Sequence, residues 1–163
     1  MKKYYNWTKG LFSSTYNIYT DSTHVGSLKN KSFSQSAIGS INGKNYIFKT
    51  KGFFKQHTDI ITSDNILIGR INFNSWKTKA QIVFKDRTVV LRAENIWNTK
   101  WKLFDTNGLH LNYSGSSTKR RIEAIEDNEL QFLIGLFVIN YFWQSSLVVL
   151  IIVFLPIWLT LFS

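Results

Sequence analysis

From Leu130 to its last residue, Ser163, the chain contains no charged residue, whereas all 20 Lys and Arg residues precede this stretch. An uncharged apolar stretch of this length has to be buried in protein or placed in lipid. Residues 1–128 carry 20 positive and 9 negative charges, a net charge of +11. A basic body joined to a neutral apolar tail favours a negatively charged partner surface, and anionic membrane lipid is the partner that we expect.

The tail is predicted to form two segments. A helix over Leu130–Trp143 would be about 21 Å long, which is shorter than the hydrocarbon core of a bilayer, about 30 Å. Because this segment is apolar on all sides, we expect it to be buried in protein. Gln144-Ser145-Ser146 then forms a polar break, and residues 147–163 form an apolar tail that is a candidate membrane anchor. The alternative is a membrane hairpin made of both segments.

The residues before the tail alternate between apolar and polar in short runs, a pattern typical of half-buried strands. Two clear runs are Leu67–Asn74 and Trp76–Ile82, and two more are Thr88–Glu94 and Asn98–Leu103. The residues that we expect to face inward in the first two runs are Leu67, Ile71 and Phe73, then Trp76, Ala80 and Ile82. Lys100 and Lys102 are expected on the outer face, opposite Trp101 and Leu103.

Turn residues separate these runs at Asn42-Gly43-Lys44, Lys85-Asp86-Arg87 and Asp105–Gly108. At such a spacing the body holds roughly 11 to 13 strands, as in an antiparallel sandwich or barrel. A closed barrel of about twelve strands is too wide for its own side chains to fill. The sequence therefore predicts a mainly β fold, an antiparallel barrel of about twelve strands around a buried apolar C-terminal helix, followed by a second apolar segment.

Four stretches carry a resemblance to a known family: Ile41–Phe48, Ile68–Ile71, Trp101–Gly108 and Gly135–Tyr141. With the order of the elements, they resemble the tubby C-terminal-like superfamily, which includes the LURP-one-related proteins and the phospholipid scramblases. The resemblance implies a barrel domain over residues 1–143 with a central helix over 129–143.

Two features of scramblases are not found in this sequence. Scramblases carry cysteines that can be palmitoylated, and this chain has no cysteine. They also have an acidic calcium-binding stretch. The acidic cluster here, Glu123, Glu126, Asp127 and Glu129, has neither the ligand spacing nor the glycine of a calcium loop.

No recognisable catalytic motif is present. The sequence has no G-x-S-x-G elbow, no phosphate-binding glycine loop and no carboxylate pair suited to acid–base catalysis. His24, His57 and His110 lie in different runs, and nothing in their spacing indicates a metal site. We therefore expect a protein that is not an enzyme and that uses no metal or cofactor.

The basic residues are the best candidates for binding. The ten that we assign to anionic lipid are Lys49, Lys51, Lys55, Lys77, Lys79, Lys100, Lys102, Lys119, Arg120 and Arg121. Each Lys or Arg near an anionic membrane contributes about 1 kcal/mol. The alternative is that these side chains are merely the solvated outer face of the barrel.

Four hypotheses remain open, in this order. The first is a membrane-associated domain whose body lies on the cytoplasmic side, since the N-terminus has no apolar core of a secretory signal. The second, ranked below it, is nucleic-acid binding by the basic barrel with stacking on Phe53 and Phe54. The third is a structural module that forms homo-oligomers through the tail. The fourth, ranked last, is an enzyme of an unrecognised type.

Overall fold

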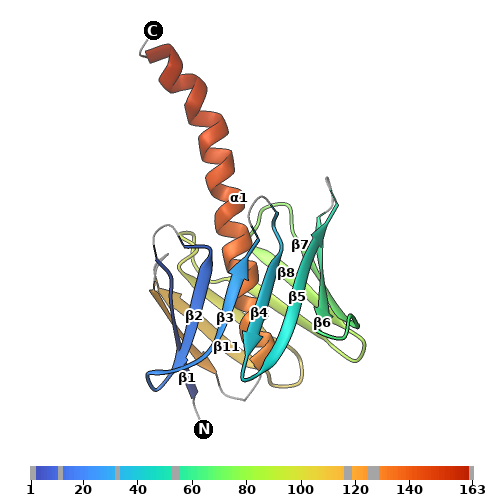
Figure 1. The fold of residues 1–163 in the computed structure, drawn as a ribbon. Helices are drawn as coiled ribbons and strands as arrows, with labels where there is room; N and C mark the ends of the chain where they lie inside the picture. Colours follow the sequence, from blue (N-terminus) through green and yellow to red (C-terminus); the bar gives the residue numbers. More distant parts are fainter. Residues whose placement is uncertain are drawn as a thin grey trace.

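The computed structural model describes residues 3–10, 13–31, 34–52, 56–115, 119–124 and 129–161, and the side chains of the helix as far as Ser145 and at Trp158 and Thr160. These residues form twelve strands and one helix (Figure 1). The strands are β1 (Lys3–Thr8), β2 (Thr15–Thr20), β3 (Thr23–Asn30), β4 (Ala37–Ile41), β5 (Lys44–Lys51), β6 (His57–Thr62), β7 (Leu67–Phe73), β8 (Lys79–Phe84), β9 (Thr88–Ala93), β10 (Lys100–Phe104), β11 (His110–Gly115) and β12 (Lys119–Ala124). The helix, α1, runs over Glu129–Leu161.

The strands form one closed barrel in which each pairs antiparallel with its neighbours in the sequence. The last strand returns to the first, with Tyr5 opposite Ile122, so the sheet has no free edge. The fold class predicted from the sequence is confirmed. The predicted turn at Asn42-Gly43 is a tight hairpin with φ of 46° and 79°, the left-handed pair that two-residue hairpins require.

The first half of α1 fills the barrel, as Figure 1 shows. Its side chains are buried from Gln131 to Phe142 on every side of the helix. Aromatic rings from the strands meet rings from the helix. Phe48 stacks on Phe137 with ring centroids 4.7 Å apart, and Trp101 lies 5.5 Å from Phe142. The helix is uniformly apolar because the barrel surrounds it, as predicted.

Gly135 allows the closest approach between α1 and the barrel wall. The phenol of Tyr113, on β11, lies over it and donates a hydrogen bond to the carbonyl oxygen of Gln131 (3.1 Å). A Cβ atom at residue 135 would lie 2.1 Å from the Tyr113 oxygen. Only glycine leaves room for this ring.

The barrel has two distinct ends. Consecutive strands are antiparallel, so successive connections alternate between the ends. At one end Asn42 donates to the carboxylate of Glu129, the first residue of α1. At the other end Gln35 donates to Ser145 (3.2 Å). We call these the helix-start end and the helix-exit end. The connections after β1, β3, β5, β7 and β9 lie at the helix-exit end, and those after β2, β4, β6, β8 and β10 lie at the helix-start end.

The predicted polar break in the tail does not interrupt the helix. α1 continues through Gln144-Ser145-Ser146 and leaves the barrel as a long rod. Ser145 is buried at the helix-exit end, where Gln35 bonds to its hydroxyl. The two segments expected from the sequence are therefore one helix, and the membrane-hairpin alternative is wrong.

Two inward assignments were also wrong. Leu67 is 55% exposed, because the pairing of β6 with β7 shifts register between Ile60 and Ile61. Trp76 is 86% exposed because β8 begins only at Lys79, so Trp76 lies in a connection rather than in a strand. Since the strand alternation does not extend to either residue, neither side chain points into the core. The other four inward residues of these runs face the core, fully or in part.

Candidate functional site

Three basic residues lie side by side on the outer face of the barrel. Lys79 on β8 pairs in register with Arg92 on β9, and Arg92 pairs with Lys102 on β10. Like charges directly opposite each other on neighbouring strands destabilise a sheet. Part of this cost is offset by Phe104, whose ring centroid lies 5.3 Å from the Arg92 guanidinium and 5.9 Å from the Lys102 ammonium.

Two further lysines extend this row toward the helix-exit end. Lys77 lies in the connection before β8, and Lys100 is the first residue of β10. We call Lys77, Lys79, Arg92, Lys100 and Lys102 the basic patch. Four of its members were predicted from the sequence. Arg92 was missed, although its outward place in the Thr88–Glu94 alternation was a signal that could have identified it.

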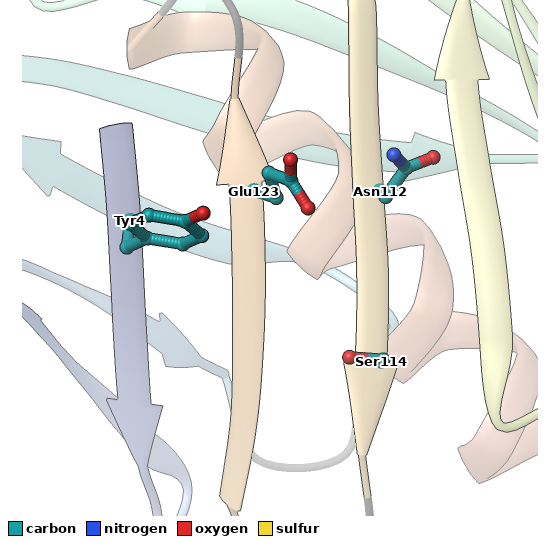
Figure 2. A pocket seen from close by; sticks show the side chains of 4 residues that line it. All are labelled: Tyr4, Asn112, Ser114 and Glu123. Carbon is teal, nitrogen blue, oxygen red and sulfur yellow. The ribbon is translucent and has the colours of Figure 1, made fainter. Parts of the chain in front are cut away.

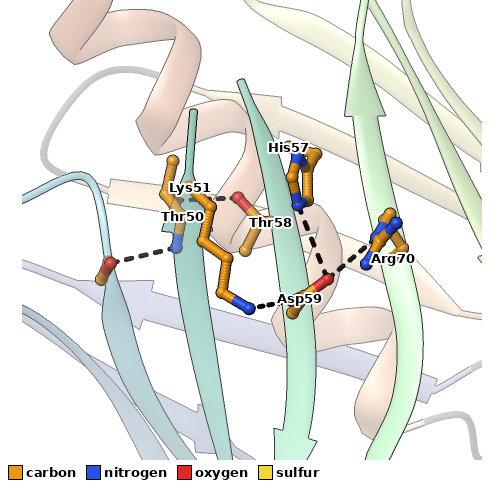
Figure 3. A network of polar contacts seen from close by, with 7 residues as sticks. Thr50, Lys51, His57, Thr58, Asp59 and Arg70 are labelled. Carbon is orange, nitrogen blue, oxygen red and sulfur yellow. Dashed lines mark hydrogen bonds and ion pairs between the residues drawn. The ribbon is translucent and has the colours of Figure 1, made fainter. Parts of the chain in front are cut away.

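Lys51, another predicted lipid-binding residue, belongs to a polar network instead (Figure 3). Its ammonium lies 2.7 Å from Oδ2 of Asp59, and Nε of Arg70 lies 2.9 Å from Oδ1. His57 approaches the same carboxylate at 4.0 Å. Because Asp59 is 3% exposed, its charge is compensated by these neighbours rather than by water. The charge of Lys51 is thus largely neutralised within the fold.

The pKa of Asp59 reflects two opposing effects. Burial raises it, but the hydrogen bonds and charges of Lys51 and Arg70 together outweigh burial and hold the pKa below its ordinary value of 3.8. A carboxylate with a lowered pKa stabilises the fold above the unfolded-state pKa, and this contribution is lost as the pH falls through the folded-state pKa.

Replacement of Asp59 by Asn should therefore destabilise the barrel by about 1–2 kcal/mol at pH 7. This estimate is modest because Lys51 and Arg70 are half-exposed. The difference in unfolding free energy between the wild type and Asp59→Asn should shrink below about pH 4. Urea unfolding at pH 7 and pH 3 measures it, and a difference that does not depend on pH would contradict this role of the carboxylate.

The other predicted residues are distributed as follows. Lys49 points outward from β5 and lines a surface hollow together with Lys31, Ser34, Ser36 and Thr50. Lys55 lies outside the described residues. The backbone of Lys119, Arg120 and Arg121 begins β12, and their side chains are outside what the structure describes. The structure therefore brings together the residues of the basic patch and leaves Lys49 and Lys51 on another side.

A second hollow lies beyond the basic patch, on the outer face of β1, β12 and β11 (Figure 2). Tyr4, Asn112, Ser114 and Glu123 line it. Asn112 pairs in register with Lys102, so the hollow borders the patch. Among the described residues that line it, the charged one is the carboxylate Glu123.

Charge is sorted between the two ends of the barrel. The acidic residues described at the helix-start end are Asp21, Asp64, Asp86, Asp105, Glu123 and Glu129. Apart from Lys51, which pairs with Asp59, the basic residues described at the helix-exit end are Lys9, Lys29, Lys31, Lys77, Lys79, Arg92 and Lys100. In the described connections of that end, Glu94 is the only acidic residue. The end from which α1 emerges is thus the basic end.

Two cations at the helix-start end, Lys44 and Arg87, have acidic neighbours. The ammonium of Lys44 lies 3.5 Å from the carboxylate of Glu129, and Arg87 lies 3.6 Å from Asp105. An anion approaching this end would meet these paired charges. Among the described residues, no ion pair involves Lys79, Arg92 or Lys102, so an anion approaching that row would meet unpaired cations. The sorting of charge is therefore stronger than the residue positions alone indicate.

Among the described residues, no group of three or more His, Asp or Glu side chains is placed to hold a metal ion. In the same part of the chain, no helix is long and apolar enough to cross a bilayer. In comparisons with known proteins, no family model, no curated protein and no solved structure matches the chain.

Proposed function

We propose that this protein is a non-catalytic domain that binds anionic phospholipid membranes through the helix-exit end of its barrel. The observation that carries the proposal is the coincidence of two features at one end. The basic patch lies near the end from which the apolar half of α1 emerges. A membrane with anionic headgroups over a hydrocarbon core is complementary to both features.

The emergent half of α1 suits insertion into lipid. Residues 146–161 extend about 24 Å at 1.5 Å per residue, compared with about 30 Å for the hydrocarbon core. Leu147–Leu155 contains no polar residue. The helix would be inserted with the barrel resting on the headgroups, so that the basic patch lies within about 10 Å of the lipid phosphates, the screening length at 0.1 M salt.

The tubby-like resemblance and the cytoplasmic placement of the barrel belong to this proposal. The barrel with a central helix is the architecture that the resemblance implies, and it supports a shared mode of membrane association. No residue role is transferred from the family, because the basic patch is defined by the strand register of this chain.

Removal of three charges from the patch tests the proposal. Full-length protein is added from dilute detergent to phosphatidylcholine vesicles with and without phosphatidylserine, and the ratio of the two partition coefficients is measured. Lys79→Gln/Arg92→Gln/Lys102→Gln should lower this ratio about 100-fold at low salt, since each cation contributes about 1 kcal/mol. The ratio isolates the electrostatic part, because the apolar helix contributes equally to both partition coefficients.

The matched control removes the same charge from the helix-start end. Lys44→Gln/Lys85→Gln/Arg87→Gln should leave the ratio nearly unchanged. Equal losses in the two triple variants would mean that net charge alone drives binding. Full-length protein that binds neither kind of vesicle would refute the proposal and favour the oligomerisation or nucleic-acid alternatives.

A further inference from the structure

Two neighbouring connections at the helix-exit end share a sequence motif and the same pattern of hydrogen bonds. The first spans β7 to β8 with the sequence Asn74-Ser75-Trp76-Lys77-Thr78-Lys79. Oδ1 of Asn74 accepts hydrogen bonds from the backbone N–H groups of Thr78 and Lys79, both at 2.9 Å, and its amide donates to the Thr78 hydroxyl (3.1 Å). Lys77 is left-handed, with φ of 53°.

The second connection spans β9 to β10 with the sequence Asn95-Ile96-Trp97-Asn98-Thr99-Lys100. Oδ1 of Asn95 accepts from the N–H groups of Thr99 (3.0 Å) and Lys100 (3.2 Å), and its amide donates to the Thr99 hydroxyl (2.7 Å). Asn98 has the same φ of 53°. The shared motif is Asn-x-Trp-x-Thr-Lys, and we call the two connections the twin loops.

Each twin loop presents its tryptophan to solvent. Trp76 is 86% exposed and Trp97 is 77% exposed, and Ile96 beside Trp97 is 89% exposed. The backbone N–H of Ala93, the last residue of β9 before the second loop, donates a hydrogen bond to the carbonyl oxygen of Thr78 in the first loop (2.9 Å). The asparagine bonds fix the loop backbone, so these large apolar side chains are held outward rather than folded onto the barrel. Adjacent exposed apolar side chains of this size indicate an interaction site.

We infer that the twin loops insert Trp76, Ile96 and Trp97 into the headgroup region of an anionic bilayer, beside the emergent half of α1. This inference rests on the proposed function and adds a second point of contact. The indole ring is suited to this depth, since its apolar body enters the lipid while its N–H group remains near water. Lys79 and Lys100, which close the two loops, are placed to meet the phosphates.

The position of the loops favours a bilayer over a nucleic acid. Stacking on bases would use the two indole rings, but it gives no role to the exposed Ile96 or to the apolar helix that leaves the barrel at the same end. A bilayer accommodates all of these features at once. A rigid pair of loops and a helix would also fix the tilt of the barrel on the membrane.

Site-specific fluorescent probes test the inference, and the absence of cysteine in the chain makes the labelling unambiguous. Full-length Trp76→Cys and Trp97→Cys, each labelled with an environment-sensitive nitrobenzoxadiazole group, are mixed with phosphatidylcholine–phosphatidylserine vesicles. The control is Ile66→Cys with the same label, since Ile66 is 58% exposed in a connection at the helix-start end. All three positions are exposed, so the substitutions should preserve the fold.

We expect the emission at residues 76 and 97 to shift to shorter wavelength and to rise severalfold on vesicle binding, with no change at residue 66. Protein that sediments with vesicles while both probes remain in water would overturn the inference and leave the proposed function intact. Protein that does not sediment would refute the proposed function itself. A shift caused by single-stranded DNA but not by vesicles would assign the twin loops to base stacking instead.

Discussion

A chain that ends at Ser145 should fold into a stable barrel, whereas a chain that ends at Ala124 should not fold. The first retains the part of α1 that the barrel buries, and the second loses it. Each buried Phe or Leu removed from a core costs about 2–5 kcal/mol. Loss of Phe132, Leu133 and Phe137 alone would therefore approach or exceed a typical total stability of about 5–15 kcal/mol.

Circular dichroism during thermal unfolding distinguishes the two chains. The chain ending at Ser145 should show a β spectrum and one cooperative transition, and the chain ending at Ala124 should show neither. The chain ending at Ser145 also separates anchoring by the apolar helix from electrostatic binding by the barrel. The chain ending at Ser145 should bind anionic vesicles only weakly and should be released by salt. Loss of cooperative unfolding in that chain would mean that residues 146–161 belong to the barrel core.

Replacement of Gly135 by Ala should destabilise the protein by about 3 kcal/mol or more. Helix propensity alone favours Ala over Gly by about 1 kcal/mol, so the expected change has the opposite sign. The steric clash outweighs the gain in helix propensity, because the new Cβ would lie 2.1 Å from the Tyr113 oxygen and 2.2 Å from Cζ. Tyr113 is 1% exposed and held between β10 and β12, so its ring cannot move aside without repacking the core.

A double-mutant cycle isolates this contact. Tyr113→Leu removes the ring atoms that meet residue 135, at its own cost in packing. In that background Gly135→Ala should cost little or should stabilise the protein, and the coupling energy should exceed 1 kcal/mol. Equal costs of Gly135→Ala in both backgrounds would show that the contact with Tyr113 does not govern this position.

The candidate site was only partly predictable from the sequence. Alternation placed Lys100 and Lys102 on the outer face and Trp101 and Leu103 in the core, as the structure has them. That pattern is local and is decided by strand geometry. The pairing of Lys51 with Asp59 was missed, because it depends on the register between β5 and β6. The twin loops were missed because alternation was extended through Trp76 into a connection.

The sequence by itself determined the barrel, its approximate number of strands and the burial of a helix within it. These features follow from period-two alternation, from turn residues and from an apolar segment too short to span a bilayer alone. Only the tertiary structure decided that the helix continues past Ser145, because a bond from Gln35 satisfies a polar side chain that looked like a break. It also decided that Lys79, Arg92 and Lys102 form one row and that charge is sorted between the two ends. Neighbours across strands are set by register over the whole closed sheet, and no local pattern specifies that register.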